Sequence, residues 1–509
     1  MMNINQNQTP LLDAINKFID TKPAYFRIPG HRLEKGISKK WTDKVGNEIF
    51  AYDVTETPLT DDLHSPEGAI LEAQKLLSQL YESDRSFFLV NGTTCGNEAM
   101  IISAALEGEK IMIARNAHKS AMMGLTISGA RPVYVMPEIL EDWGIQGGIT
   151  PKAVREKFEE HPDCKALFIV SPSYYGICSD LEGIAKVCHE YGALLLVDEA
   201  HGGHMYFHDR LPKGALRAGA DMCVQSFHKV TGALTQSSVM HICDNLGKID
   251  IDKVASNLHL VQSTSPSYLL MTSLDCARYE LSQNGEQMMS QAIEMAQYAR
   301  KKINSIKGFK CMTSEVKGIA GISETDETRL VISAKEMAIT GFELDDILFE
   351  KFDVNMELSD YENVLAIITY ANTQDEIERL ITACEKISAD YSISDNKSSV
   401  GENGIKKACY IEENSKECFF DSDNIPEQKM TPRQAYFAKS EEIEWQQALG
   451  RVSAQLIAPY PPGIPVVYPG EIINSKVWNY IEQLRKDNRH IHGLEAGSNI
   501  IKVIAKIKH

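Results

Sequence analysis

Residues 193–202 read A-L-L-L-V-D-E-A-H-G, an apolar run that ends in an acid and a short polar loop. Such a run is typical of a buried strand. Similar short apolar runs recur from residue 65 to residue 245, and segments of helical period alternate with them, which is the pattern of a largely parallel sheet. We predict an α/β domain with seven strands, at residues 86–90, 110–115, 132–136, 166–170, 193–198, 222–226 and 238–242.

Apolar residues at steps of three and four predict an amphipathic helix that starts after Ser65. The positions that carry this pattern are Ile70, Ala73, Leu76, Leu77, Leu80 and Tyr81.

Composition divides the chain into further units. We predict an N-terminal arm at residues 1–64, a large domain at 65–289 and a smaller α+β domain at 290–390, with strands at 329–333 and 364–370. Residues 391–428 are polar and lack apolar periodicity, which predicts a linker or an insertion. A C-terminal domain is expected at 429–509; its segment 460–471, Y-P-P-G-I-P-V-V-Y-P-G-E, indicates a rigid loop with at most a short strand at V-V-Y.

Overall composition excludes several classes of protein. The chain has 509 residues, of which 43% are hydrophobic, and a formal net charge of -18. The length allows sizeable cores, and the acidic balance argues against a nucleic-acid partner while it suits a cationic ligand. Eleven cysteines without a C-x-x-C pair indicate reduced thiols. No signal peptide or membrane-spanning run is apparent, so we expect a cytoplasmic protein without a membrane partner.

Polar clusters follow five of the predicted strands. They are N-G-T-T-C-G-N (91–97), R-N-A-H-K-S (115–120), S-P-S-Y-Y-G (171–176), D-E-A-H-G-G-H (198–204) and S-F-H-K (226–229). Ligands of open parallel sheets bind outside the carboxyl ends of the strands, where helix N-termini and loops converge. The five clusters are therefore expected to line one cleft.

The residue types in these clusters suggest individual roles. Thr93 and Thr94 open a predicted helix, and hydroxyl and backbone N–H groups there can bind a phosphate, although a helix cap without a ligand is an alternative. Asp198 ends an apolar strand, where a carboxylate needs a cation, a protonated nitrogen or a capping role. His118 can stack on a flat ring, although a loop or core histidine is the commoner case.

His201, His204 and His208 have a spacing that resembles a metal-ligand set. The glycines between them make a regular helix doubtful, and no cysteine or carboxylate completes the set. We predict no metal site.

Lys229 lies in S-F-H-K-V-T-G-A-L-T-Q (226–236), a stretch with almost no other charge. A lysine partly removed from water loses proton affinity and can form a Schiff base with an aldehyde. An anion site, a carboxylate for a ring nitrogen, an imidazole for a ring face and this amine together suit pyridoxal 5'-phosphate. The alternative is a solvated loop lysine.

Taken together, these motifs resemble the Orn/Lys/Arg decarboxylases, which are fold-type I pyridoxal-phosphate enzymes, and in particular the short bacterial arginine decarboxylases without an N-terminal receiver-like domain. The resemblance covers nearly the whole chain. Besides the five clusters it rests on R-I-P-G-H-R (27–32), P-L-T-D-D-L-H-S-P-E-G (58–68), T-S-P-S-Y-L-L-M-T-S-L-D (264–275) and Y-P-P-G-I-P (460–465).

The resemblance implies a role for each matching residue. Lys229 would bind the cofactor covalently, with His228 beside it as a proton donor or a neighbour of the reacting carboxylate. Asp198 would keep the ring nitrogen protonated, and His118 would stack on the ring. Other residues expected at the cofactor are Ala200, His201, Thr93, Thr94 and Ser226, and also Thr264 and Ser265 from a neighbouring subunit of a homodimer.

The implied reaction is decarboxylation of a basic amino acid, arginine first, to agmatine and carbon dioxide in polyamine biosynthesis. Lysine or ornithine as the substrate, an aminotransferase of the same fold and a cofactor-binding regulator without turnover are the alternatives. A cationic side chain needs an acid in the pocket, and we expect Glu471, or else Asp61 or Asp62. A surface acid or a helix cap is the alternative for each of these three.

Overall fold

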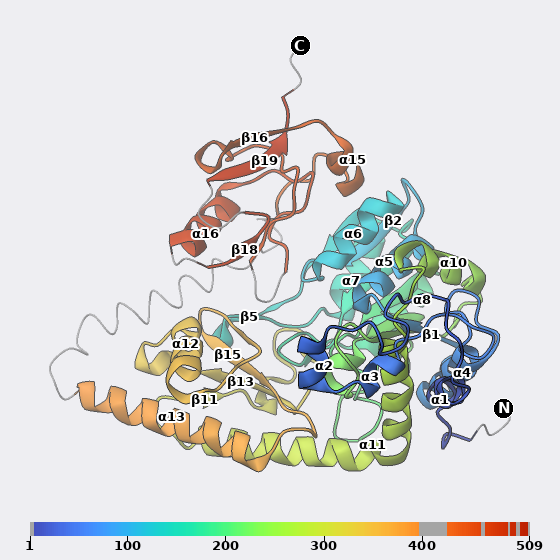
Figure 1. Cartoon of the computed structure of the whole chain (residues 1–509). Coiled ribbons are helices and arrows are strands. Elements are labelled where there is room, and N and C mark those ends of the chain that lie inside the picture. The colour runs from blue at the N-terminus through green and yellow to red at the C-terminus, as the bar shows by residue number, and fades with distance from the viewer. Residues whose placement is uncertain (1–4, 396–424, 460–463, 487–488, 495–498, 507–509) are drawn as a thin grey trace.

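The strand that ends in Asp198 lies at the centre of a seven-stranded sheet. The computed structural model describes residues 5–395, 425–459, 464–486, 489–494 and 499–506. In Figure 1 the large domain lies on the right, a smaller domain lies at the lower left, and the C-terminal domain lies above them.

The large sheet has the order β1-β10-β9-β8-β6-β2-β3. Neighbouring strands from β9 to β3 are parallel, whereas β10 is antiparallel to both of its neighbours. The mostly parallel α/β fold is confirmed, and all seven predicted strands match to within one residue at each end. Their bounds are β1 Arg85–Leu89, β2 Lys110–Ala114, β3 Arg131–Val135, β6 Ala166–Val170, β8 Leu194–Asp198, β9 Met222–Gln225 and β10 Ser238–Ile242.

Helices cover both faces of this sheet, which explains why its central strand is apolar throughout. Leu194 and Leu196 of β8 belong to one core with side chains of α5, α6 and α10, whereas Leu195 and Val197 belong to the opposite core with α4, α7 and α8. The predicted helix after Ser65 is α4. The bounds are α4 Ala69–Tyr81, α5 Gly92–Ala104, α6 Lys119–Ser128, α7 Pro151–Glu160, α8 Leu181–Glu190 and α10 Ile251–Val261.

The small domain is built on an antiparallel sheet of order β11-β13-β15-β14. Both strands predicted here exist, as β13 and β15. One helix, α11, begins in the core of the large domain and ends in the core of the small domain, so no loop separates the two (Figure 1). The bounds are α11 Tyr268–Ile303, β11 Lys310–Cys311, β13 Arg329–Ser333, α12 Gly341–Phe352, β14 Leu358–Ser359, β15 Asn363–Ile367 and α13 Gln374–Asp395.

The C-terminal domain packs its own core around Trp445, Val467, Val477 and Ile481. Val467 forms a single bridge with Ile457, which agrees with at most a short strand at V-V-Y. Helix α13 continues to Asp395, past the predicted boundary at residue 390, and most of the predicted linker (396–424) and residues 460–463 lie outside the described residues. The bounds are α15 Pro432–Phe437, β16 Ser440–Glu444, β17 Ala458–Pro459, α16 Ser475–Lys486, β18 Ile491–His492 and β19 Ile500–Ile504.

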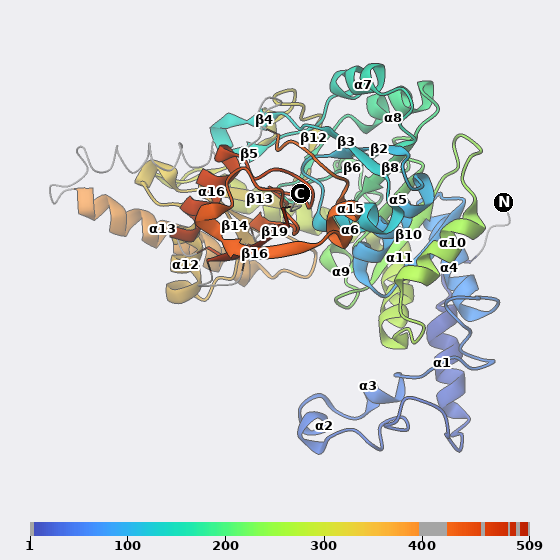
Figure 2. The same cartoon turned by 90° about the horizontal axis from the view of Figure 1, so that it is seen from above.

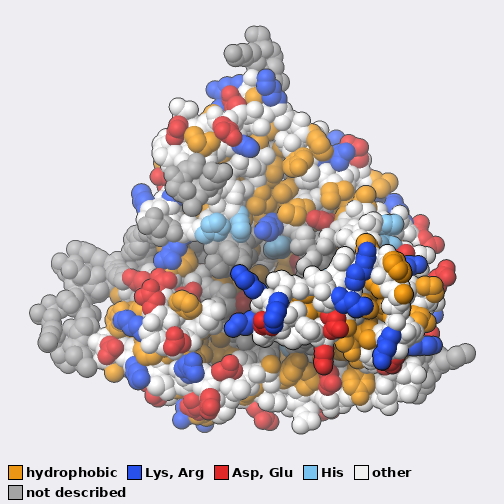
Figure 3. Space-filling view, in the orientation of Figure 1, with side chains coloured by type: hydrophobic (Ala, Val, Ile, Leu, Met, Phe, Trp, Pro, Cys, Tyr) orange, Lys and Arg blue, Asp and Glu red, His pale blue; other side chains and the backbone are white. Residues whose placement is uncertain are grey.

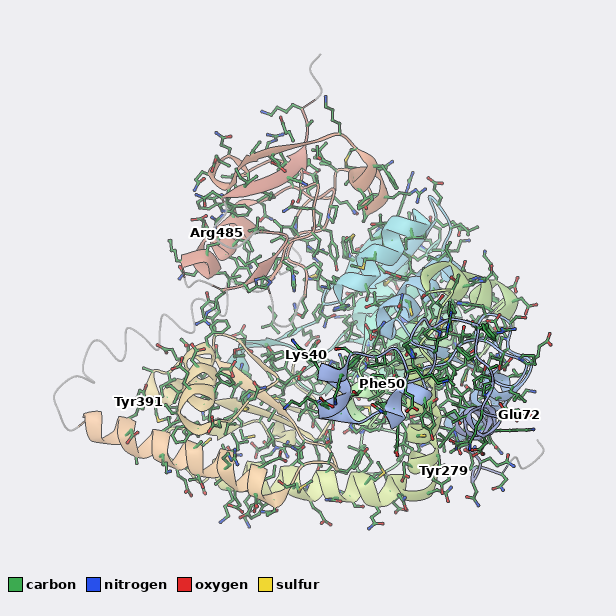
Figure 4. All side chains as sticks on the ribbon, viewed as in Figure 1. Lys40, Phe50, Glu72, Tyr279, Tyr391 and Arg485 are labelled. Atoms are coloured by element: carbon green, nitrogen blue, oxygen red, sulfur yellow. The ribbon has the colours of Figure 1, made fainter. Side chains whose placement is uncertain are left out.

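The N-terminal arm has two parts. Helix α1 (Pro10–Asp20) buries Leu11 and Ile15 in the core shared with α4 and α11. Helices α2 (Lys39–Val45) and α3 (Glu48–Ala51) project away from the body of the molecule, as Figure 2 shows, and Figure 4 labels Lys40 and Phe50 there. In the described part of the chain, no helix combines the length and the apolar character needed to cross a bilayer.

Candidate active site

A cavity of about 420 Å³ opens at the carboxyl ends of the parallel strands. Its walls come from all three domains: His118 and Lys229 belong to the large domain, Asp360 to the small domain, and Val466 and His490 to the C-terminal domain. Figure 3 shows this face of the molecule hollowed between the domains, with histidine side chains in pale blue at the hollow. Each of the five polar clusters contributes to the cavity lining. The residues are Thr93, Asn116, His118, Ser173, Tyr174, Tyr175, Asp198, Ala200, His201 and Lys229.

Lys229 lies on the short helix α9 (Phe227–Val230), directly after β9, and its side chain lines the cavity. Its Nζ lies 2.8 Å from His201 Nε2 and 4.9 Å from the centroid of the Tyr174 ring. Burial lowers the pKa of Lys229 to about 8, because the ammonium form loses hydration, and the negative charge of Asp198 opposes this shift. Lys229 is therefore not a solvated loop residue.

Asp198 lies at the end of β8, buried, and lines the same cavity. Asn97 Nδ2 donates a hydrogen bond to Asp198 Oδ2 over 2.7 Å, and the backbone N–H of Ala200 donates to Oδ1 over 3.1 Å. Burial raises the pKa of Asp198, and the positive charge of Lys229 and the bond from Asn97 oppose this shift. The carboxylate thus lies at a place where a protonated ring nitrogen would compensate its burial.

The N-terminus of α5 is open toward the cavity. The helix begins at Gly92, whose φ of +67° lies in the left-handed region and which has nothing within 4 Å on its Cβ side. Thr93 lines the cavity, and its Oγ1 lies 3.2 Å from Ser226 Oγ. A Cβ at Gly96 would lie 2.5 Å from Val224 Cγ1, so glycine allows the first turn of α5 to press against the sheet. Thr94 lies in the same turn, outside the cavity lining.

His118 lines the cavity from the N-cap of α6, where its Nδ1 accepts a hydrogen bond from the backbone N–H of Ser120. Burial, together with the positive charge of Lys229, lowers the pKa of His118 to about 4. The imidazole is therefore neutral near pH 7, so it can stack on a ring with a protonated nitrogen without adding a second positive charge.

Glu471 requires a correction, because the structure places it outside the cavity. Its carboxylate is fully buried and lies 3.0 Å from Arg115 Nη2. The rings of Tyr134 and Tyr468 lie 4.8 and 4.4 Å from Arg115 Cζ. A carboxylate held by a buried arginine in this way joins the C-terminal domain to the large domain and has no access to a substrate side chain.

Asp61 and Asp62 are also placed away from the cavity of their own chain. Asp61 Oδ2 accepts hydrogen bonds from the backbone N–H groups of Gly68 and Ile70 at the start of α4. Asp62 Oδ1 accepts one from the backbone N–H of His64. In the structure, Asp61 therefore caps a helix and Asp62 caps a turn, which is the alternative role considered for these acids.

The remaining predicted residues divide into two groups. Ala200 and His201 line the cavity, whereas the His228 ring bonds the carbonyl oxygen of Ser237 over 2.9 Å and lies outside the lining. Thr264 and Ser265 lie on an exposed loop before α11, away from the cavity of their own chain.

Two histidines of the pattern that resembles a metal-ligand set, His201 and His204, are buried, and each has a different partner. His201 Nε2 forms a hydrogen bond with Lys229 Nζ, and His204 Nε2 lies 3.1 Å from Asp326 Oδ2.

Sequence reasoning missed several cavity residues, among them Phe342, Asp345 and Asp360 of the small domain and Arg489 of the C-terminal domain. They lie on α12, on the turn between β14 and β15 and after α16, and no motif marks them. Only the folded chain brings these segments next to the large domain. Tyr174 is different, because it belongs to S-P-S-Y-Y-G, a cluster that the sequence did indicate.

Comparison with known proteins identifies the family. A model of the major domain of the Orn/Lys/Arg decarboxylases matches residues 9–323, and a model of their C-terminal domain matches residues 413–500. The chain belongs to the Orn/Lys/Arg decarboxylase family. The resemblance seen in the sequence is thereby confirmed.

Two relatives of this family member match over nearly their full length. The arginine decarboxylase of Bacillus subtilis is 36% identical over 99% of this chain and 99% of its own length. That of Halalkalibacterium halodurans is 37% identical over 96% of each. Among solved structures, the lysine decarboxylase LdcF of Francisella novicida has a TM-score of 0.82 at 21% identity and covers 98% of this chain and 81% of its own; this likeness concerns the fold.

Proposed function

We propose that this protein is a pyridoxal-phosphate-dependent decarboxylase that converts L-arginine to agmatine and carbon dioxide, a reaction of polyamine biosynthesis. The observation that carries the proposal is the identity of 36% over nearly the whole chain with a protein named arginine decarboxylase. The amine of Lys229, with its lowered pKa, in a cavity shared with Asp198 and His118 supports it.

The donor groups of the cavity fit this cofactor. A phosphate could bind at the start of α5, where the N-cap residue Asn91 makes no side-chain capping bond, together with the hydroxyls of Thr93 and Ser226, which lie 3.2 Å apart. An aldehyde could react with Lys229, because its pKa of about 8 leaves part of the amine uncharged near neutral pH. A protonated ring nitrogen could pair with the buried carboxylate of Asp198, and the face of the ring could stack on the neutral imidazole of His118.

When bound, the cofactor supplies a protonated ring that takes up the electron pair left on the α-carbon as carbon dioxide departs. The protein holds the components in place. Asp198 retains the proton at the ring nitrogen by its negative charge, and Ala200 and His118 hold the ring. Lys229 Nζ would hold the cofactor through its aldehyde group and would supply a proton at the α-carbon. His228 supports Lys229 indirectly, by fixing the segment that contains Ser237.

We also propose a homodimer that completes the phosphate site with Thr264 and Ser265 of the partner chain. Their exposed loop lies away from the cavity of its own chain. The projecting arm carries apolar side chains that are mostly exposed in the single chain, including Phe26 at 87% and Trp41 at 55%. Exposed aromatic groups of this size suit burial against a second copy. The free cysteines of the described chain fit a reducing cytoplasm, which we propose as its location.

Purified protein loaded with pyridoxal phosphate tests the proposal. We expect it to release carbon dioxide from arginine faster than from lysine or ornithine. Borohydride should bleach the cofactor band and attach the label to Lys229. A keto-acid-dependent amino transfer without gas release would instead establish an aminotransferase, and a spectrum that responds to no basic amino acid would establish a binding protein without turnover.

A further inference from the structure

The cavity already contains a guanidinium group that belongs to the protein. Arg489 Cζ lies 3.9 Å from the centroid of the Phe342 ring, well within the range of a cation–π contact. Both residues line the cavity that contains Lys229. Arg489 follows α16, on which Figure 4 labels Arg485 at the side of the C-terminal domain nearest the small domain. The contact thus joins the walls supplied by these two domains.

A carboxylate accompanies the aromatic ring. Phe342 and Asp345 are three residues apart on α12, so their side chains share one face of the helix, and Asp345 also lines the cavity. Ser359 Oγ donates a hydrogen bond to Asp345 Oδ2 over 2.8 Å and orients it. Burial raises the pKa of Asp345, and the positive charge of Arg489 opposes the shift, so the guanidinium acts on both the ring and the acid.

The start of α12 is fixed by close packing. A Cβ at Gly341 would lie 2.1 Å from the carbonyl oxygen of Asn363, so glycine allows the helix to touch the turn between β14 and β15. The backbone N–H of Gly341 donates to the carbonyl oxygen of Tyr361, and the Tyr361 ring contacts the edge of Phe342 at 5.2 Å and 74°. The ring and the acid therefore belong to a preformed surface.

The second acid of this wall is less available. Asp360 accepts hydrogen bonds from Tyr175 Oη over 2.6 Å and from the backbone N–H groups of Glu362 and Asn363. Because these hydrogen bonds use the carboxylate of Asp360 to stabilise the turn between β14 and β15, Asp345 is the better hydrogen-bond acceptor for a ligand.

We propose that Phe342 and Asp345 form the subsite for the guanidinium group of the substrate, and that Arg489 occupies this subsite until the substrate displaces it. The inference rests on the proposed function, because it assigns the side-chain end of the same reaction. A planar guanidinium stacks on an aromatic ring while it donates to a carboxylate, whereas a compact ammonium group makes less use of the ring face. The subsite therefore selects arginine over lysine and ornithine.

Titration calorimetry on the holoenzyme, with agmatine and cadaverine as probes, tests this without turnover. We expect F342L and D345N each to weaken agmatine binding roughly 10-fold and cadaverine binding less than about 3-fold. R489A should act in the opposite direction and tighten agmatine binding roughly 3-fold or more, because the competing guanidinium is gone. Exposed residues of α12 and α16 provide matched controls, F349A, E350Q and K486A, which should leave both affinities unchanged.

Several outcomes overturn the proposal. If F342L and D345N weaken both probes equally, or neither, in protein that melts like wild type, the guanidinium binds elsewhere. If R489A weakens agmatine binding, Arg489 is part of the wall for the substrate and is not displaced. Carbon dioxide release from arginine is measured in parallel: a wild type that binds agmatine as described but releases no gas contradicts the proposed reaction and leaves the subsite intact.

Discussion

Lys229 Nζ and His201 Nε2 lie 2.8 Å apart, inside a cavity built by three domains. Burial and the charge of Lys229 hold the pKa of His201 well below its usual range, so the imidazole is neutral and its Nε2 can accept a hydrogen bond from the ammonium group. The pair therefore orients the amine toward the cavity without adding a second charge.

Covalent loading of the cofactor should follow the ionisation of this amine. Because the pKa of Lys229 is lowered to about 8, the uncharged and reactive fraction rises as the pH increases through that value. We expect the rate at which cofactor-free protein acquires the bound cofactor band to rise between pH 7 and pH 9 and then to level off. K229R should fold but show no borohydride-stable label. A rate that still rises steeply above pH 10 would indicate an ordinary lysine.

Replacement of Asp198 should separate two effects of its charge. D198N removes the carboxylate that we propose keeps the ring nitrogen protonated, and we expect kcat to fall by about 100-fold or more. The same change removes a negative charge that raises the pKa of Lys229, so the pH profile of cofactor loading should move to lower pH. The exposed acid Asp209 offers a control, because D209N should change neither measurement.

Glu471 should matter for stability and not for substrate binding. E471A removes the carboxylate that is paired with the buried guanidinium of Arg115, which costs about 3–5 kcal/mol of the free energy of unfolding. Denaturant unfolding of the variant measures this loss, and E442Q, at an exposed ion pair of the same domain, should lose less than about 1 kcal/mol. A large increase in KM for arginine with unchanged stability would restore the role that the sequence suggested for Glu471.

His118 should make the cofactor-free protein sensitive to acid. Its pKa is lowered to about 4 from an ordinary value near 6.5, so the unfolded chain binds a proton more readily than the folded chain, and stability falls as the pH drops through this window. Between pH 7 and pH 5 the contribution is about 2 kcal/mol. H118F should lose less stability over this range in chemical denaturation. Equal losses in the two proteins would show that His118 is protonated without penalty.

Mixed dimers test the shared site. K229A and the double variant T264A/S265A should each be inactive or weakly active alone, since one lacks the amine and the other lacks the proposed phosphate ligands for its partner. After joint refolding, one site of each mixed dimer is intact, and about a quarter of the wild-type activity should return. No recovery in verified mixed dimers would place Thr264 and Ser265 outside the site.

The sheet was predictable to within a residue because its strands are apolar runs bounded by polar clusters. The clusters were informative for a physical reason: parallel strands bring their carboxyl ends to one edge, so residues such as Thr93, His118, Asp198 and Lys229 converge without any long-range information.

The acid in the pocket was not predictable in the same way. Glu471 has the position in the sequence expected of a binding residue, yet its partner Arg115 lies more than three hundred residues away in the chain, and only the folded structure pairs them. Asp345 carries no signal in the sequence, because an acid on an amphipathic helix is ordinary. The role that we propose for Asp345 depends on which part of the folded chain packs against α12.

The spread of the cavity along the polypeptide has a consequence for how the protein is made. Thr93 and Asp198 emerge early from the ribosome, whereas Val466 and His490 emerge almost last. A nascent chain that has completed only the large and small domains lacks the wall that Val466 and His490 supply to the cavity containing Lys229. We therefore expect vitamin B6 to be captured after translation ends, and chains that terminate prematurely to leave the ribosome unable to retain it.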